Sequence, residues 1–541
     1  MTPQGNKPLA MPRAVCQASQ ADGCHWEKPA SWSVHFFQLL FLVVMLFQLD
    51  APFLSAHNER QNQTFDMARH VFRDGWRSIV TPKASFSRTG FEAQRFTAVL
   101  QEVPFYGVIG WPLTLFTSHE RAVVRLVSTA FALISIQLLY WILRFWLPPA
   151  PSAAGAALWA TAPMMLHFGQ VPMPDILCTT GILAAFWFAL RGKLPASSGC
   201  FLFAILAKPS VIPFGLPILV ALLVAGSCRS KRNFLQLSLA WGWLPLLGLL
   251  LWMGLLYWFA PPTPISMKKI MVDLGSWSVL VSLSFYKLVL GCLLPFGLGV
   301  MGCVGMVFAM RPQRLKMDQR IKWAIISSIL FFLVCMVRKV SEPQYMLPIL
   351  AWCVVPASFG FNLLMDKLRA GAAWRIALGT ALIMHVLVAL ALTIDLKASR
   401  VPNFPDIERA AQLLPPDARV VVVYRFFGLS LAVWLDRNVV SLNEPTGMAG
   451  RFTALRRFGF THVLILDVES WHDKKSAVEP LAWGGRLYQV LRKTPPVIGA
   501  DLPGYADPAN PFRRYCDQNF SPLFVAPHVV LYSMNSPPAA K

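Results

Sequence analysis

Long hydrophobic runs, separated by short polar stretches, dominate the chain from residue 33 to residue 396. Runs of this kind are typical of helices that cross a lipid bilayer. The first, Val34 to Leu49, has no small-residue cleavage site after it, which favours a retained span over a signal peptide. Further runs lie at about 122–146, 153–169, 173–191, 198–208, 210–226, 236–259, 286–310, 321–337, 344–364 and 373–396. The pattern predicts an all-α polytopic membrane domain over residues 33–396, preceded by a cytoplasmic tail, residues 1–32.

Basic residues between the runs predict the orientation, because lysine and arginine concentrate in the cytoplasmic loops of membrane proteins. They cluster in four short segments: 191–193, 229–232, 311–322 and 367–375. This pattern places the N-terminus inside and the region after residue 396 outside. A short run at 103–117, broken by two glycines and two prolines, then lies at the outer interface without crossing. With this assignment the chain has about eleven transmembrane helices in total, the first run included.

Two large regions are therefore expected on the outer side of the membrane. One is the first extracytoplasmic loop, residues 52–121. The other is residues 397–541, where the pattern changes to that of a small soluble α/β domain. Strand-like runs lie at 419–424, 439–442 and 462–466, and helix-like segments at 406–414 and 426–435.

Composition narrows the class of protein. The chain is 55% hydrophobic and only 14% charged, which excludes a disordered chain and argues against a single soluble domain. Its net charge of +22 would suggest a nucleic-acid partner in a soluble protein. Here most basic residues lie in loops between membrane spans, so membrane lipids are the expected partners and nucleic acid is not. Cysteines lie mostly in apolar runs and lack the paired spacing of a metal site.

Acidic residues near the outer face are candidates for chemistry, because the chain has only 27 acids. Glu59 begins a predicted helix, in which Glu59, Asp66 and Arg73 share one stripe beside an apolar side. Glu102 enters the interfacial run, and Asp175 stands at the mouth of an apolar helix. A plain amphipathic surface helix with solvated charges is the competing interpretation of the first spacing. Helix capping is the alternative for Asp175.

Cations at the same face are candidates for binding an anionic substrate. Lys208 interrupts a strongly apolar stretch, where a charge is costly and more often functional. Arg338 and Lys339 lie at the outer end of one span, and Lys268-Lys269 in the loop at 260–285. Snorkelling beside lipid head groups is the competing interpretation. Together, acids and cations suit a lipid-linked phosphate substrate with a polar acceptor: cations stabilise the departing phosphate and a carboxylate deprotonates the acceptor.

Several motifs, each weak alone, occur in an order that resembles a known enzyme group. They are His57-Asn58-Glu59-Arg60, Arg69…Asp74-Gly75-Trp76, Glu102-Val103-Pro104, Arg121…Arg125-Leu126, Pro163…Asp175, Leu206-Ala207-Lys208-Pro209 and Tyr345-Met346-Leu347-Pro348. Over residues 33–440 the chain resembles the GT-C membrane glycosyltransferases that use polyprenyl-phosphate sugars. It is most similar to family 39, with the dolichyl-phosphate-mannose protein mannosyltransferases, and to the related lipid A aminoarabinose transferase.

The resemblance implies a glycosyltransferase that moves a hexose or pentose from a polyprenyl-phosphate donor to a lipid, glycan or protein acceptor. Its site would lie on the periplasmic side of a bacterial inner membrane. It assigns catalysis to Glu59 and Asp175, and substrate binding to Glu102, Lys208 and Tyr345. The charge pattern at the outer face adds three candidates for substrate binding: Asp66, Arg338 and Lys339. Asn58 stands where the family often has Asp, and Val103 where the aminoarabinose transferase has Lys. Some GT-C enzymes use a divalent cation; no other cofactor is expected.

Two alternatives remain open at this point. A transporter or flippase of a lipid-linked or anionic substrate would carry charges deep within several spans. Here His385 is nearly the only ionisable residue midway along one, and we interpret it as a buried hydrogen-bonding group. A non-catalytic scaffold displaying residues 397–541 would leave the acids after the first span unexplained.

Overall fold

The structure is a computed structural model, and it describes most of the chain. The described residues are 24–46, 49, 58–75, 77–80, 86–87, 102–225, 231–259, 289–290, 297–309, 317–335, 343–368, 372–397, 404–423, 433–442, 447–466, 507–527 and 529–536. Contacts divide the chain into two compact units. The first comprises residues 1–49, 101–103 and 125–393, and the second residues 50–100, 104–124 and 394–541.

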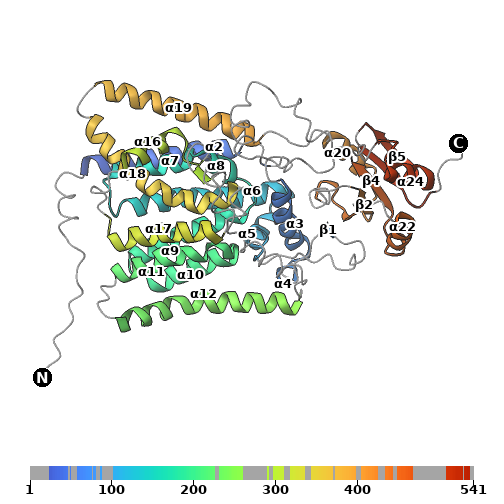
Figure 1. Cartoon of the computed structure of the whole chain (residues 1–541), viewed down its shortest axis with the longest axis horizontal. Helices are drawn as coiled ribbons and strands as arrows, with labels where there is room; N and C mark the ends of the chain where they lie inside the picture. Colours follow the sequence, from blue (N-terminus) through green and yellow to red (C-terminus); the bar gives the residue numbers. More distant parts are fainter. Residues whose placement is uncertain are drawn as a thin grey trace. The chain divides into compact units, whose positions relative to one another are not determined.

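The first unit is helical. Its helices are α2 (Cys24–Leu46), α6 (Glu120–Leu143, whose first turn belongs to the second unit), α7 (Pro149–Thr161), α8 (Pro163–Phe168), α9 (Pro174–Leu190), α10 (Leu194–Ala207), η1 (Pro209–Phe214), α11 (Gly215–Ala225), α12 (Lys231–Phe259), α16 (Gly299–Ala309), α17 (Gln319–Cys335), η4 (Pro343–Met346), α18 (Leu347–Leu368) and α19 (Ala372–Lys397). Figure 1 shows the axes of α9, α10, α11 and α12 running in roughly the same direction. Each predicted hydrophobic run overlaps at least one of these helices in the residues that the structure describes.

Prolines divide some of the predicted runs. The run at 153–169 becomes α7 and α8, because Ala162 has an extended ψ of 130° immediately before Pro163. A residue that precedes proline is sterically disfavoured from the helical region. Lys208 before Pro209 ends α10 in the same way, with φ −159° and ψ 103°. The predicted spans 198–208 and 210–226 are thus one helix, a 3-10 turn and a second helix.

Small residues allow close helix packing inside this unit. A methyl group added at Gly360 of α18 would overlap the carbonyl oxygen of Gly305 in α16. One added at Gly155 of α7 would overlap the Ser358 hydroxyl. Apolar helices in lipid associate by such close contact between small residues, since no hydrophobic driving force acts between them. His385 of α19 is also internal and lies 2.9 Å from the Thr161 hydroxyl through Nε2, as the sequence indicated.

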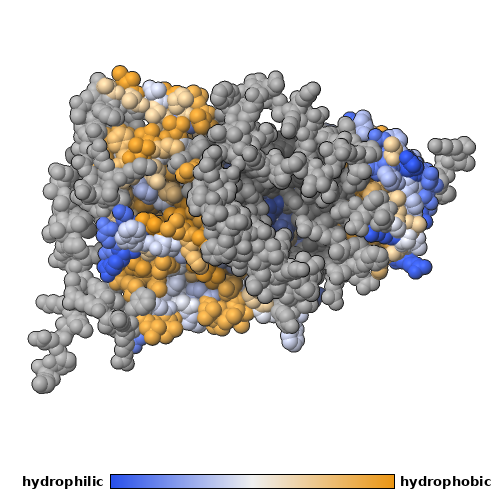
Figure 2. All heavy atoms as spheres, in the orientation of Figure 1, coloured by the Kyte–Doolittle hydropathy of each residue, from blue (hydrophilic) through white to orange (hydrophobic). Residues whose placement is uncertain are grey.

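Figure 2 shows hydrophobic side chains, in orange, over much of the coloured part of the helical unit on the face in view. The exposed large apolar side chains of this unit include Leu239, Trp243, Leu250 and Trp258 of α12 and Ile376 and Ile383 of α19. A surface of this kind is stable in contact with lipid. Among the described residues, three helices are long and apolar enough to cross a membrane: Glu120–Leu143, Leu235–Leu255 and Leu347–Met365. The total of about eleven spans stays a prediction.

The second unit contains the predicted amphipathic helix, α3 (Asn58–Asp74), and the short helices α4 (Arg77–Val80) and α5 (Phe105–Thr114). At ten residues α5 is about 15 Å long, about half the thickness of a bilayer core. Its glycines were expected to interrupt a span; they also admit α3. A methyl at Gly107 would lie 2.6 Å from Val71 Cβ, and one at Gly110 would meet Phe72.

A mixed sheet forms the rest of the second unit, in the order β1-β3-β2-β4-β6-β5. The strands are β1 (Phe86–Ser87), β2 (Arg419–Val423), β3 (Asn438–Ser441), β4 (His462–Leu466), β5 (Ser521–Ala526) and β6 (Val529–Ser533). The three predicted strands are present as parallel neighbours. The first loop also contributes β1, which pairs with β3. Helices α20 (Phe404–Gln412), α22 (Met448–Arg457) and α24 (Pro511–Asn519) accompany the sheet (Figure 1).

Candidate functional site

Prolines place the two charged residues that dominate the interior of the helical unit. Pro174 begins α9, so Asp175 lies in its first turn. Met173 is the N-cap and no side chain caps this helix, which means that the capping explanation for Asp175 is wrong. The Thr179 hydroxyl donates to the backbone carbonyl of Asp175 at 2.7 Å. The Asp175 carboxylate remains available to a partner outside its own helix.

That partner is Lys208. Its ammonium Nζ donates to Asp175 Oδ1 at 2.5 Å, and the two side chains are 6% and 1% exposed. The same Nζ lies 3.5 Å from the centre of the Tyr345 ring, which η4 supplies just before α18 begins. An ammonium over an aromatic face is attracted by the electron density of the ring. Lys208 therefore has an ionic and an aromatic partner at once.

Burial gives this pair its significance. Removing two charges from water costs more than most ion pairs return, so a buried pair is weak evidence for a purely stabilising role. A snorkelling lysine would expose its ammonium at the head groups, and Lys208 does not. An ammonium has three N–H donors, so the bond to Asp175 leaves donor capacity for a bound anion.

Glu102 approaches the same pair. The backbone N–H of Val103 donates to the carbonyl of Leu206 at 3.0 Å, which attaches this segment to the last turn of α10. The negative charge of Glu102 acts on Lys208 from there. The structure thus gathers four of the predicted residues in the helical unit: Glu102, Asp175, Lys208 and Tyr345. The sequence did not single out Cys178, whose buried thiol donates to the Asp175 carbonyl at 3.1 Å.

A second charged cluster lies in the second unit and centres on α3. Asp66 is 1% exposed, and its Oδ1 accepts from Arg69 Nη2 at 2.7 Å. The other terminal nitrogen of Arg69, Nη1, donates to Asp436 Oδ1 at 2.5 Å. Arg69 is itself buried, with 5% of its side chain exposed. One guanidinium therefore joins a carboxylate on its own helix to one 367 residues along the chain.

Arg73, one turn further along α3, extends the cluster. It donates to the same Asp436 oxygen at 3.1 Å and to both carboxylate oxygens of Glu120, at 3.1 and 3.2 Å. The pKa of Asp436 lies below its ordinary value: partial burial raises it, but the charges of Arg69 and Arg73 outweigh that effect. Asp436 and Glu120 were not among the sequence candidates. The only local signal for Asp436 is an acid between a helix-like and a strand-like segment.

Three predicted site residues have no described side chain. Glu59 lies in the first turn of α3, and the structure describes its backbone alone. Arg338 and Lys339 lie outside the described residues, as do Lys268 and Lys269. Within the described ranges, no three His, Cys, Asp or Glu side chains group as metal ligands.

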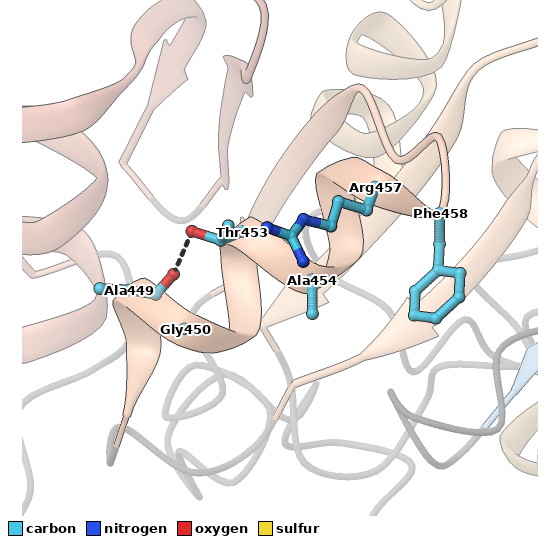
Figure 3. Close-up of a pocket in the computed structure, with 6 residues that line it drawn as sticks. All are labelled: Ala449, Gly450, Thr453, Ala454, Arg457 and Phe458. Carbon is cyan, nitrogen blue, oxygen red and sulfur yellow. Dashed lines mark hydrogen bonds between the residues drawn. The ribbon is translucent and has the colours of Figure 1, made fainter.

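A separate hollow of about 530 Å³ lies on the C-terminal part of the second unit. Figure 3 shows its lining along α22: Ala449, Gly450, Thr453, Ala454, Arg457 and Phe458. Thr453 donates its hydroxyl to the carbonyl of Ala449 and is thereby occupied within the helix. None of the predicted site residues lines this hollow, so it does not enlarge the site proposed from the sequence.

Comparison with known proteins gives one sequence-family match and several similar structures. Residues 104–258 match the family described as dolichyl-phosphate-mannose-protein mannosyltransferase. No curated protein matches the sequence.

The structure is similar to ArnT from Cupriavidus metallidurans over 94% of this chain. The apo form has a TM-score of 0.58, with 17% identity over 98% of its own length. The form bound to undecaprenyl phosphate has a TM-score of 0.59, with 16% identity over 99% of its length. A third similar structure is the archaeal oligosaccharyltransferase AglB from Archaeoglobus fulgidus, in complex with an inhibitory peptide and a dolichol-phosphate. The match covers 82% of this chain and 70% of the AglB chain, with 11% identity and a TM-score of 0.54.

These likenesses confirm the resemblance to the GT-C fold that the motifs indicated. At such low identities the solved structures establish the fold of the chain. The apolar helices agree with an integral membrane protein of that fold.

Proposed function

We propose that this chain is a membrane glycosyltransferase that moves a sugar from a polyprenyl-phosphate donor to an acceptor on the outer side of the membrane. The observation that carries the proposal is the buried Lys208–Asp175 pair under the Tyr345 ring, within a GT-C fold. Ionisable groups inside an apolar helical domain are costly and are generally retained for function.

In this proposal Lys208 binds the donor phosphate. The ammonium keeps its bond to Asp175 and directs its remaining N–H groups to the phosphate, whose negative charge increases as the sugar leaves. Charge-assisted contacts of this kind strengthen toward the transition state and so accelerate the reaction. Asp175 holds the lysine in place, and Tyr345 and Glu102 shape its surroundings. Arg338 and Lys339 are proposed as additional phosphate ligands.

The transfer breaks one bond and forms one. The acceptor nucleophile attacks the anomeric carbon of the sugar, and the bond from that carbon to the phosphate oxygen breaks. Polyprenyl phosphate leaves with the bonding electrons, and Glu59 takes the proton of the acceptor as general base. Asp66, on the same helix, is proposed to bind substrate. We propose a lipid, glycan or protein acceptor and a location in the bacterial inner membrane.

The transport alternative is less well supported. A flippase would move its lipid-linked substrate intact, and the solved structures that share this fold include an oligosaccharyltransferase. No described feature favours transport over transfer specifically.

The test uses purified full-length protein in lipid nanodiscs with a panel of polyprenyl-phosphate sugars. Free polyprenyl phosphate is measured by mass spectrometry, with and without acceptor-containing membrane extract. We expect release with at least one donor, and a large reduction in the Glu59→Gln variant. Absence of release with every donor and extract would contradict the proposal.

A further inference from the structure

The charged cluster on α3 has a feature that the proposed reaction does not use. Asp436 belongs to the turn that precedes β3 and takes no part in the sheet. Among the described non-glycine residues, Asp436 alone has a positive φ, 52°. Aspartate and asparagine tolerate this left-handed conformation better than other side chains. An acid at this position combines that tolerance with a negative charge.

That charge is bound from one helix at two points. Arg69 and Arg73 are four residues apart, so they lie on the same face of α3 in successive turns. Both donate to the same oxygen, Asp436 Oδ1. Each contact lies off the helix axis and therefore opposes rotation of the helix about that axis, and two contacts one turn apart oppose it together. A second restraint on α3 comes from α5, because the Val71 side chain of α3 packs directly against Gly107 of α5.

The same arginine carries the constraint to a candidate acid. Arg69 uses Nη1 for Asp436 and Nη2 for Asp66, so the two carboxylates are fixed to one rigid planar group. Glu59 lies two turns before Asp66 on the same helix.

We propose that Asp436 is a positioning residue, which fixes the rotation of α3 through Arg69 and Arg73 and thereby orients the acids that α3 carries. The proposal rests on the proposed function for its catalytic consequence and on the contacts alone for its structural part. Asp436 does not touch substrate in this account. It makes the C-terminal sheet domain necessary for full activity of the membrane enzyme.

The decisive variant is Asp436→Asn, which retains the left-handed turn and removes the charge. Its matched control is Asp406→Asn, because Asp406 pairs at 3.8 Å with Arg409 of its own helix α20. Hydrogen–deuterium exchange of peptides covering residues 58–74 measures the order of α3 in full-length protein. The rate of donor turnover is measured on the same samples, with kcat and KM determined separately.

We expect Asp436→Asn to speed exchange of α3 at least several-fold while β4 and β6 keep wild-type exchange. Because small misplacements of reacting groups slow reactions by factors of this size, we expect kcat to fall by up to about 100-fold when α3 loses its orientation. We expect KM to change little. Asp436→Glu restores the charge and part of kcat, and Asp406→Asn behaves as wild type. Should Asp436→Asn fail to fold, Arg73→Gln takes its place. It removes one of the two contacts to Asp436 together with the Arg73–Glu120 pair, and we expect faster exchange of α3 and a lower kcat, each by a smaller factor.

Wild-type exchange of α3 in a folded Asp436→Asn protein would overturn the proposal, whatever the activity. Equal loss of kcat in Asp406→Asn would also overturn it, because the effect would then follow from any charge removed from this domain. If the wild-type protein turns over no donor, the proposed function fails, while the exchange measurement still decides whether Asp436 orders α3.

Discussion

Replacing Lys208 with methionine removes an ammonium from the centre of the proposed donor site while keeping a long apolar side chain. Two effects follow, and the structure separates them. Asp175, at 1% exposure, is left without its cation at Oδ1, and breaking a buried pair in this way destabilises a protein by about 3–5 kcal/mol. The proposed contact to phosphate is lost as well, which is worth about 1.5–3 kcal/mol.

The second effect is the informative one. A loss of about 1.5–3 kcal/mol corresponds to a reduction in donor affinity or turnover of roughly 10- to 150-fold, since 1.4 kcal/mol is a factor of ten. A double variant, Asp175→Asn with Lys208→Met, removes both charges. It leaves no unpaired buried charge, so we expect its thermal stability to recover much of the loss. Donor binding stays weak, because the phosphate still lacks its cation.

The assay is binding of a polyprenyl-phosphate sugar to the wild type, to each single variant and to the double variant, after confirmation of membrane insertion. Wild-type donor binding by a well-inserted Lys208→Met protein would refute the reasoning. Recovered binding in the double variant would also refute it, because Lys208 would then serve only to neutralise Asp175.

Four further predictions address other parts of the account. Glu59→Gln keeps the size of the side chain but removes the base, and we expect a reduction in kcat of about 10²–10⁴-fold in the transfer assay; wild-type turnover would exclude this role. Topology reporters fused after Arg232 and after Lys397 are expected on opposite sides of the membrane, and the same side for both would break the predicted orientation. Gly360→Leu places a side chain against the Gly305 carbonyl and should lower the thermal unfolding temperature. Gly242→Leu is the control and should leave that temperature unchanged, because a methyl added there meets nothing within 4 Å. Equal effects of the two variants would contradict the packing argument. The pKa of Asp436 is lowered in the folded state because the charges of Arg69 and Arg73 outweigh its partial burial, so its contribution to stability is present above the ordinary pKa of about 3.9 and is lost as pH falls through the folded pKa. The difference in unfolding free energy between wild type and Asp436→Asn should therefore be constant from pH 7 to about 4 and shrink below it. A difference that persisted at lower pH would point to a cause other than charge.

Local pattern was sufficient to predict much of the fold. Hydrophobic runs predicted the helices from α6 to α19, and short runs rich in valine and isoleucine predicted β2, β3 and β4. These elements are encoded within short windows, where one periodicity dominates. The division of one run into α7 and α8 depends on a single dipeptide, Ala162-Pro163, and run length alone does not reveal it.

Contacts between distant residues explain most of what the sequence did not predict. Lys208 and Asp175 are 33 residues apart. Asp175 follows a proline at the start of one helix and Lys208 precedes a proline at the end of another, so their proximity is compatible with the predicted outward turns. Asp436 and Arg69 are 367 residues apart, and no local periodicity connects them. The two-residue strand β1 likewise pairs with the distant strand β3, and its own residues carry no strand pattern that would have predicted it.

The most direct test of the central claim is a stoichiometric one. Purified protein in nanodiscs receives an isotopically labelled polyprenyl-phosphate sugar and the acceptor fraction identified by the donor panel, and both products are counted by mass spectrometry. We predict one free polyprenyl phosphate for each labelled sugar that the acceptor gains, with both products strongly reduced together in Glu59→Gln. Movement of intact donor across the membrane, with neither product formed, would contradict this prediction.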